Sequence, residues 1–311
     1  MSAAPPSRSA ARRARAEVSA IVEHHFGTPP RRVVRRGGGL TNLVFAVDHP
    51  EGELVVRMNP APDKIGEFIK EQWAVARARE SGIPVPEVLE VGNGVGTHPY
   101  MISRHVRGEP ALRHPERERI LREMGRLTAR INGIPTDGWG ATFDWSHNRL
   151  SRNDSWEACL QRELCVDDRL AVLARLGGLD DDRLARLREA LEGLSDAGPT
   201  LAHGDMRMKN VIVDARGGIV AVIDWDECRS APAPAWDLAI ALHDLSIDDK
   251  RAFVEGYGLD ADALERLAGP MRALNLLHYA PWLERAEAAG DRDELAHLRA
   301  RLRGAFELYG V

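Results

Sequence analysis

A short stretch around residue 205 combines the polar side chains that phosphoryl transfer requires. The loop HGDMRMKN carries Asp205 and Asn210, and IDWD places Asp224 further on, beyond a DARGG turn. Phosphoryl transfer needs a carboxylate to orient or deprotonate the attacking hydroxyl, oxygen ligands for Mg²⁺, and positive charge on the phosphates. One loop can aim Asp205 and Asn210 into a single cleft, and the predicted hairpin returns Asp224 to it. The alternative is a solvated hairpin with incidental acids.

These motifs resemble the signature of the aminoglycoside phosphotransferase and choline kinase superfamily, which shares its catalytic core with protein kinases. The resemblance implies that Asp205 is the catalytic base, that Asn210 and Asp224 are Mg²⁺ ligands, and that His203 supports the loop. Trp225 stands where a protein kinase has the Phe of its DFG motif, which favours the small-molecule branch.

A further aspartate, Asp237 in PAPAWDLAIAL, is similar to the family residue that ties the catalytic loop to the next helix. Its alternative is an acid that stabilises a helix N-terminus through the helix dipole. The resemblance covers roughly residues 30–260. It implies an α+β, two-lobed, protein-kinase-like fold, with a nucleotide-binding lobe at 1–105 and a larger, mainly helical catalytic and substrate-binding lobe at 106–311.

A glycine-rich loop between two predicted strands is the first candidate for nucleotide binding. Glycines let the backbone approach phosphates, and Thr and Asn side chains add donors. The family carries a similar loop at this place, although three glycines between strands also form ordinary turns. The loop residues assigned to the nucleotide are Gly38, Gly39, Thr41 and Asn42.

Arg57, in the next predicted strand, takes the place of the Lys that protein kinases pair with the phosphates and with a helix Glu. Arg can hold a carboxylate through two parallel bonds. The family pattern favours Glu71 as its partner, with Glu67 as a competing candidate, and an outward-facing strand arginine is the alternative. The adenine is expected on the backbone of the connecting segment, at Ser103, His105 and Val106.

The acceptor site is expected in the segment 139–175, which is rich in tryptophans and acids. Such residues suit a polycationic sugar through charge pairing and cation–π contacts, although tryptophans in the core and acids on helix surfaces would give the same composition. The segment INGIPTDGWG resembles relatives that act on hygromycin-like antibiotics, but it is too short to assign a substrate. The candidate substrate-binding residues are Asp154, Glu157, Asp226 and Glu227.

Hydrophobic periodicity predicts the elements that position these residues. It predicts an antiparallel sheet in the first hundred residues with one inserted helix, then a mainly helical region interrupted by the hairpin. Helices are predicted near 9–26, 63–81, 115–132, 155–175, 181–195 and from 235 to the end, with a loop at 134–154.

Composition sets broader limits. A net charge of −5 and a pI near 6.1 lack the basic bias of nucleic-acid binders. Three cysteines in no metal-binding pattern favour a reduced, cytoplasmic setting. No apolar run is long enough to span a membrane.

The sequence therefore predicts a small-molecule kinase that uses Mg²⁺ and ATP, with GTP as an alternative donor. The leading acceptor is an aminoglycoside or similar cationic antibiotic, as in an antibiotic-resistance enzyme. The alternatives are a kinase of a neutral sugar, amino alcohol or other metabolite, and a nucleotide-binding pseudokinase that serves as an interaction module. The complete set of Asp205, Asn210 and Asp224 argues against the pseudokinase. The oligomeric state stays open between monomer and dimer.

Overall fold

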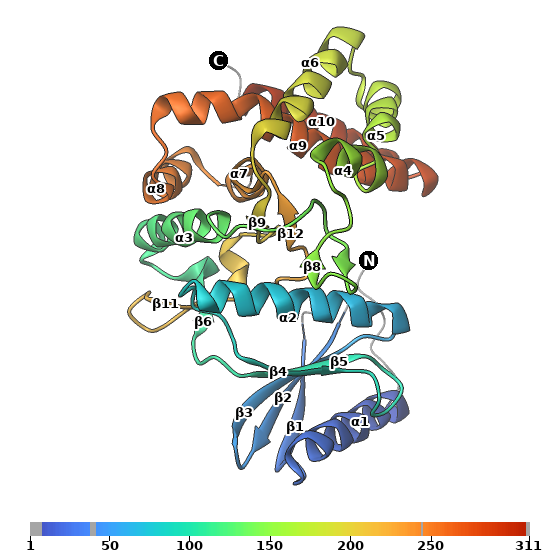
Figure 1. The fold of residues 1–311 in the computed structure, drawn as a ribbon, viewed down its shortest axis with the longest axis vertical. Helices are drawn as coiled ribbons and strands as arrows, with labels where there is room; N and C mark the ends of the chain where they lie inside the picture. Colours follow the sequence, from blue (N-terminus) through green and yellow to red (C-terminus); the bar gives the residue numbers. More distant parts are fainter. Residues whose placement is uncertain (1–7, 38–41, 244, 309–311) are drawn as a thin grey trace.

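The N-terminal part of the chain is built on a five-stranded antiparallel sheet. The computed structural model describes residues 8–37, 42–243 and 245–308. The strand order is β1-β2-β3-β5-β4 (Figure 1). Alternate residues of the central strands are buried, which fits a sheet whose faces differ in their surroundings. The strands are β1 (Arg32–Arg36), β2 (Leu43–His49), β3 (Gly52–Met58), β4 (Val88–Gly92) and β5 (Tyr100–Arg104).

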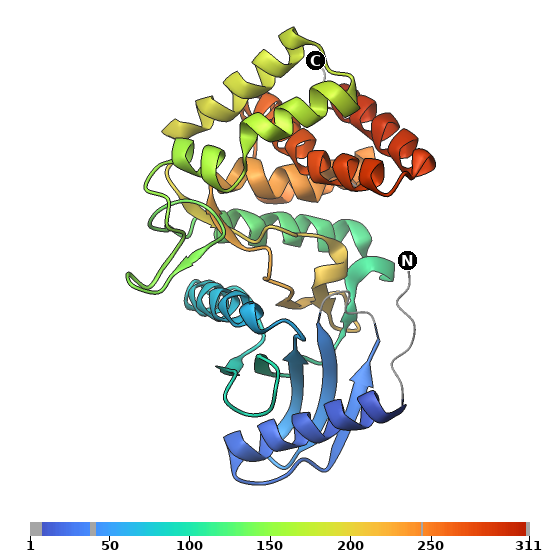
Figure 2. The same cartoon turned by 90° about the vertical axis from the view of Figure 1, so that its right-hand side faces the viewer.

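Helix α1 (Arg8–Phe26) covers one face of this sheet. Its Val18, Ile21 and Val22 are fully buried in a cluster with Phe45 and Val56 of the central strands. Figure 2 shows α1 lying along the sheet on the side away from the rest of the molecule. The helix therefore closes a small apolar core of its own with the sheet.

Helix α2 (Ile65–Glu80) lies between the sheet and the helical part of the molecule, and both views show it there (Figures 1 and 2). Its Ala74, Val75 and Ala78 are buried in the large core of the C-terminal part. Residues on α2 can therefore contact both the sheet and the catalytic stretch.

The C-terminal part is mainly helical, with short strands around the catalytic stretch. Strand β10 pairs with β11 and β6, and β9 pairs with β12. Its helices are α3 (Arg117–Asn132), α4 (Trp156–Arg162), α5 (Val166–Val172), α6 (Asp181–Glu192), α7 (Ala233–His243), α8 (Ile247–Tyr257), α9 (Ala261–Ala288) and α10 (Arg292–Leu308). Its strands are β6 (Glu109–Pro110), β7 (Phe143–Asp144), β8 (Arg149–Leu150), β9 (Thr200–Ala202), β10 (Val211–Val213), β11 (Ile219–Val222) and β12 (Arg229–Ala231).

The predicted α+β architecture of a sheet part and a larger helical part is confirmed, as is the hairpin β10–β11. Two local predictions were wrong. The helix expected at 155–175 is divided into α4 and α5, because Cys165 adopts a left-handed φ of 47° that breaks the helix. The loop expected at 134–154 contains the short pair β7–β8. The division at residue 105 stays a prediction. Among the described residues, no helix combines the length and apolarity that crossing a membrane demands.

Candidate active site

The catalytic loop follows strand β9 and is fixed by a buried carboxylate. Asp237, near the start of α7, accepts hydrogen bonds of 2.9 Å from the backbone N–H groups of His203 and Gly204. The side chain of Asn132 on α3 donates a third bond of 2.7 Å. Burial raises the pKa of Asp237, and these hydrogen bonds counteract part of that rise. The contacts are those expected of a residue that ties the loop to the next helix.

Gly204 is required by the local backbone. Its φ is +83°, and a Cβ at this position would lie 2.1 Å from the carbonyl oxygen of Glu227. A side chain would therefore push apart the catalytic loop and the segment that follows Asp224.

His203 is a structural residue of the loop. Its Nδ1 accepts from the backbone N–H of Asp205 at 3.2 Å, and its Nε2 lies 3.1 Å from the carbonyl oxygen of Ile223, to which it donates. Burial lowers the pKa of His203 to about 4, so the ring is neutral near pH 7. The Trp225 ring packs against the imidazole in a tilted arrangement, with ring centroids 4.6 Å apart, so His203 links the Asp205 loop to the Asp224 loop.

The carboxylate of Asp205 has three polar neighbours. Arg207 Nε lies 2.9 Å from Oδ1, and Lys209 Nζ lies 2.8 Å from Oδ2. Asn210 Nδ2 donates to Oδ2 at 2.9 Å and to the Asp205 carbonyl oxygen at 2.8 Å. Because the amide nitrogen of Asn210 faces Asp205, its amide oxygen is the atom directed elsewhere. Arg207 and Lys209 lie inside the HGDMRMKN motif, but the motif pattern indicates no role for either residue.

Asp224 has an unusual backbone conformation, and its carboxylate lies near that of Asp205. Its φ is +69°, which is uncommon for a residue with a side chain. The backbone N–H of Ile223 donates to the carbonyl oxygen of Asn210 at 2.9 Å, which joins the two segments directly. Burial raises the pKa of Asp224, while nearby Arg57 and Lys209 act to lower it. Asp205, Asn210 and Asp224 are therefore brought together, as predicted.

Asp226 belongs to the same electrostatic group. Burial and the neighbouring carboxylates of Asp224 and Glu71 raise its pKa to about 7. Its backbone carbonyl oxygen accepts a 2.5 Å hydrogen bond from Lys70 of α2, a buried lysine that the sequence analysis missed. In the sequence, the one indication of a role for Lys70 is its position directly before Glu71 in a predicted helix.

Arg57 and Glu71 form a buried salt bridge between β3 and α2. Burial alone would lower the pKa of Arg57, but Glu71, Asp224 and Asp226 raise it overall. Glu67 pairs instead with Lys64. The structure therefore selects Glu71 over Glu67 as the partner of Arg57.

The remaining nucleotide candidates are placed only in part. Gly38, Gly39 and Thr41 lie outside the described residues. Asn42 Oδ1 accepts a 2.8 Å hydrogen bond from the side chain of Asn59, just after β3. Ser103 is the penultimate residue of β5 and pairs with Val55, and the backbone N–H of His105 donates to the Glu53 carbonyl oxygen at 3.0 Å. Val106 follows in the segment that leaves the sheet.

The four candidate substrate residues do not form one group. Asp226 and Glu227 lie beside the catalytic loop. Asp154 is 88% exposed and pairs with Arg149. Glu157 lines a surface pocket between α4 and α6 that includes no residue of the catalytic loop.

The aromatic residues expected around an acceptor are divided in the same way. Trp139 and Trp156 are buried, with ring centroids 5.6 Å apart, and Trp156 Nε1 donates to the Leu191 carbonyl oxygen at 2.7 Å. Trp145 is 56% exposed. Trp139 and Trp156 are therefore core residues, as the alternative reading of the segment 139–175 expects, and Trp145 is not.

A cavity of about 240 Å³ adjoins the catalytic loop at Arg207; we call it the Arg207 cavity. Its walls come from α7, α9 and α10. Its other lining residues are Ile240, His243, Asn275, His278, Tyr279, Trp282, Glu294, His297, Leu298 and Arg301.

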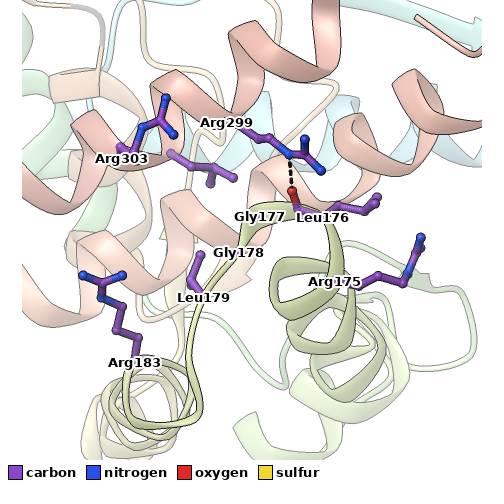
Figure 3. A pocket seen from close by; sticks show the side chains of 9 residues that line it. Arg175, Leu176, Gly177, Gly178, Leu179, Arg183, Arg299 and Arg303 are labelled. Carbon is purple, nitrogen blue, oxygen red and sulfur yellow. Dashed lines mark hydrogen bonds between the residues drawn. The ribbon is translucent and has the colours of Figure 1, made fainter. Parts of the chain in front are cut away.

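A separate pocket lies between α6, α10 and the turn that ends at Gly177, and it contains no predicted site residue (Figure 3). Arg175, Arg183, Arg299 and Arg303 surround it. Arg299 donates to the Leu176 carbonyl oxygen at 2.6 Å, and Arg175 pairs with Glu287. These arginines are exposed, which is typical of a solvated helix surface.

The sheet and α2 form one lobe, and the helical part that carries the Asp205 loop forms the other. Together they define a two-lobed kinase-like fold. The model of the phosphotransferase enzyme family matches residues 32–274. The chain therefore belongs to this family, which confirms the class of small-molecule kinases that its motifs predicted.

The chain is similar to hygromycin-B 4-O-kinase of Escherichia coli, with 26% identity over 197 residues. The match covers 61% of this chain and 55% of that enzyme, so the chain spans about half the length of the curated relative it matches.

Two solved structures share the fold. A thermostable mutant of aminoglycoside phosphotransferase APH(4)-Ia, in ternary complex with ADP and hygromycin B, has a TM-score of 0.67 and 21% identity and covers 95% of this chain and 99% of that chain. A putative fructosamine-3-kinase from Haemophilus somnus 129PT has a TM-score of 0.63 and 16% identity, with 93% and 96% covered.

Proposed function

We propose that this protein transfers the γ-phosphoryl group of ATP to a hydroxyl group of a small molecule. One observation carries the proposal: Asp205, Asn210 and Asp224 lie at one place, next to the buried pair of Arg57 and Glu71. A carboxylate, hard oxygen ligands and a fixed cation are the parts that phosphoryl transfer uses.

The proposed roles follow from the contacts. Asp205 orients the acceptor hydroxyl and takes its proton. Arg57, held by Glu71, supplies positive charge to the phosphates. The amide of His105 is already bonded to Glu53, so in the predicted segment we assign the backbone contact to adenine to Val106. The glycine-rich loop, including Gly38, Gly39 and Thr41, is proposed to cover the phosphates.

The residues present fit a magnesium ion. The Asn210 amide oxygen and the Asp224 carboxylate are hard oxygen donors, and the nucleotide phosphates complete such sites. Bound Mg²⁺ would neutralise charge that develops on the phosphates. Among the described residues, no group of three or more His, Cys, Asp or Glu side chains is arranged to hold a metal ion.

Two acceptor classes have support from different relatives. A cationic aminoglycoside such as hygromycin B is supported by the named activity of the Escherichia coli relative. A sugar-derived metabolite is supported by the fructosamine-kinase neighbour. The three free cysteines are consistent with a reducing, cytoplasmic location.

The test is a coupled ADP-release assay on wild type and Asp205→Asn, with ATP and GTP as donors. The acceptor panel includes aminoglycosides, sugars and amino alcohols. We expect Asp205→Asn to reduce kcat by about 10²-fold or more and to leave Mg·ATP affinity in place, with a one-phosphate mass increase on the acceptor. Retained turnover in Asp205→Asn would remove Asp205 from its role as base.

A further inference from the structure

The β7–β8 hairpin extends from the C-terminal part of the molecule to helix α2. Its Phe143 packs against Trp73 of α2, with the two rings tilted and their centroids 6.1 Å apart. Both views show the hairpin beside α2 (Figures 1 and 2). Phe143 is 7% exposed, and Trp145 packs edge-on against its ring at 5.6 Å between centroids. The hairpin therefore makes a buried aromatic contact between the two parts of the molecule.

The base of the hairpin is fixed to the scaffold of the catalytic loop. Gly140 exchanges backbone hydrogen bonds of 2.7 and 2.9 Å with Ser230 of β12, and β12 pairs with β9, the strand that precedes the loop. At the end of α4, Glu163 accepts 2.7 Å and 2.9 Å hydrogen bonds from the Ala141 backbone N–H and the Asn153 side chain. Because its base is held from two sides, the hairpin presents Phe143 to α2 from a fixed position.

The Trp73 side chain is held by packing. Its Nε1 is buried and has no hydrogen-bond partner in the part of the chain that the structure describes. The guanidinium group of Arg77 lies 5.5 Å from the Trp73 ring centroid, on the exposed side of α2. Since no directional bond to Nε1 orients the indole, its position depends on the rings and chains that it packs against, and Phe143 is the ring that the C-terminal part supplies.

Trp73 lies one helical turn after Lys70, whose ammonium group donates to the Asp226 carbonyl oxygen. Residues three apart on a helix are neighbours on its surface, about 5–6 Å apart at their Cβ atoms. Two adjacent turns of α2 are therefore held by two different segments of the C-terminal part. A single contact leaves a helix free to pivot about it, and a second contact on the next turn restricts that motion. Glu71, which holds Arg57, lies between these two points.

We propose, resting on the proposed function, that Phe143 and Trp73 are positioning residues for phosphoryl transfer. The contact between their rings fixes the orientation of α2. The helix then places the phosphate-binding arginine through Glu71 and the Asp224 loop through Lys70. The hairpin thus contributes to the use of the nucleotide, although it belongs to the C-terminal part.

The first experiment measures amide hydrogen exchange by mass spectrometry and needs neither nucleotide nor acceptor. Trp73→Leu keeps an apolar side chain at this half-buried position but removes the ring. We expect exchange in residues 222–228, which α2 contacts through Lys70, to rise at least about threefold. An unchanged exchange rate there overturns the coupling.

The matched control is Leu187→Ala on α6. Leu187 is 4% exposed in the same core cluster as Phe143, and α6 lies at the far end of the helical part from α2 (Figures 1 and 2). The control also loses buried apolar volume, but it should keep exchange in residues 222–228 within about 1.5-fold of wild type. An equal rise in both variants would show general loosening and contradict the proposal.

The second experiment is a double-mutant cycle on kcat/KM for Mg·ATP, measured as ADP release. Trp73→Leu and Phe143→Leu should each lower it at least about fivefold. The double variant should fall no more than about twofold below the weaker single variant, because both changes remove the same contact. Trp73→Phe, which keeps an aromatic ring, should stay within about twofold of wild type. Losses that multiply in the double variant, or an equal loss in Trp73→Phe, would show that the ring contact has no positioning role.

The outcomes separate the two proposals. If wild type does not bind Mg²⁺ with a non-hydrolysable ATP analogue in calorimetry, the proposed function fails, while the exchange experiment still decides whether Trp73 couples to residues 222–228. If wild type binds the nucleotide and Trp73→Leu keeps both its exchange and its kcat/KM, the positioning role is wrong and the proposed function stands. The exchange experiment depends only on the half-buried Trp73, so it holds even if Phe143→Leu does not fold.

Discussion

The ammonium group of Lys70 donates a 2.5 Å hydrogen bond to the backbone carbonyl oxygen of Asp226, although the two residues belong to different parts of the molecule. Lys70 is 6% exposed. The next residue along α2, Glu71, holds Arg57. Two consecutive residues of one helix therefore fix both the proposed phosphate-binding arginine and the loop that carries Asp224.

Lys70→Met should impair both Mg²⁺ use and turnover. The change leaves the buried Asp226 carbonyl oxygen without its donor, so the Asp224 loop loses a contact that costs about 1–3 kcal/mol to break. We expect kcat/KM for Mg·ATP to fall at least about tenfold and the Mg²⁺ concentration for half-maximal rate to rise, with partial recovery in Lys70→Arg. Arg79→Met, on the exposed side of the same helix, is the control. An unchanged Mg²⁺ requirement in Lys70→Met would leave the contact with a purely structural role.

Glu71→Gln and Glu67→Gln should differ sharply. Glu71 is buried and pairs with Arg57, whereas Glu67 forms an exposed pair with Lys64. Loss of a buried partner leaves Arg57 poorly held, while an exposed pair contributes less than about 1 kcal/mol. Steady-state kinetics should show a fall in kcat/KM for ATP of about 10²-fold in Glu71→Gln and in Arg57→Met, against less than about threefold in Glu67→Gln. Equal losses in the two glutamate variants would contradict the assignment.

Gly204→Ala should destabilise the protein strongly. The added Cβ would meet the Glu227 carbonyl oxygen at 2.1 Å, on a backbone with φ of +83°. We expect the free energy of unfolding to fall by about 2–4 kcal/mol, measured by urea denaturation. Gly193→Ala, where a Cβ meets open space, should change it by less than about 0.5 kcal/mol. Similar midpoints for the two variants would show that the catalytic loop tolerates a side chain.

His203 should make stability fall in mild acid. Its pKa is about 4 in the folded protein, below the ordinary 6.5, so below pH 6.5 the unfolded chain binds a proton that the folded chain does not. Stability from this group is full above pH 6.5, decreases as pH falls, and is lost near pH 4. The total is on the order of 3 kcal/mol. Urea unfolding at pH 7 and pH 4.5 should show a smaller pH dependence for His203→Gln than for wild type. His24→Gln, on the exposed surface of α1, should keep the wild-type dependence.

The sequence predicted the parts of the site that depend on local spacing. Asp205, Asn210 and Asp224 are placed by one loop and one hairpin. Their residue types and their spacing along the chain were therefore enough to predict that they lie together. Arg57 and Glu71 required the family pattern, because a strand and a helix bring them together. Lys70 and Arg207 could not be assigned, since their roles follow from where their side chains end: against the Asp226 carbonyl oxygen and between Asp205 and a cavity.

The candidate acceptor residues were not brought together, and composition explains why. Acids and tryptophans between 139 and 175 carry no spacing that distinguishes a core residue from a ligand contact. Trp156 is buried, and Asp154 is committed to Arg149. Composition alone could not separate these outcomes, because each side chain's environment is set by helices distant in the sequence.

The segment INGIPTDGWG is part of the scaffold beneath the catalytic loop. Asn132 bonds Asp237, Thr136 Oγ1 lies 2.5 Å from Ser230 Oγ, and Gly140 exchanges backbone hydrogen bonds with Ser230. Because this segment supports the catalytic loop, a resemblance confined to it is explained by that structural role and does not identify the acceptor.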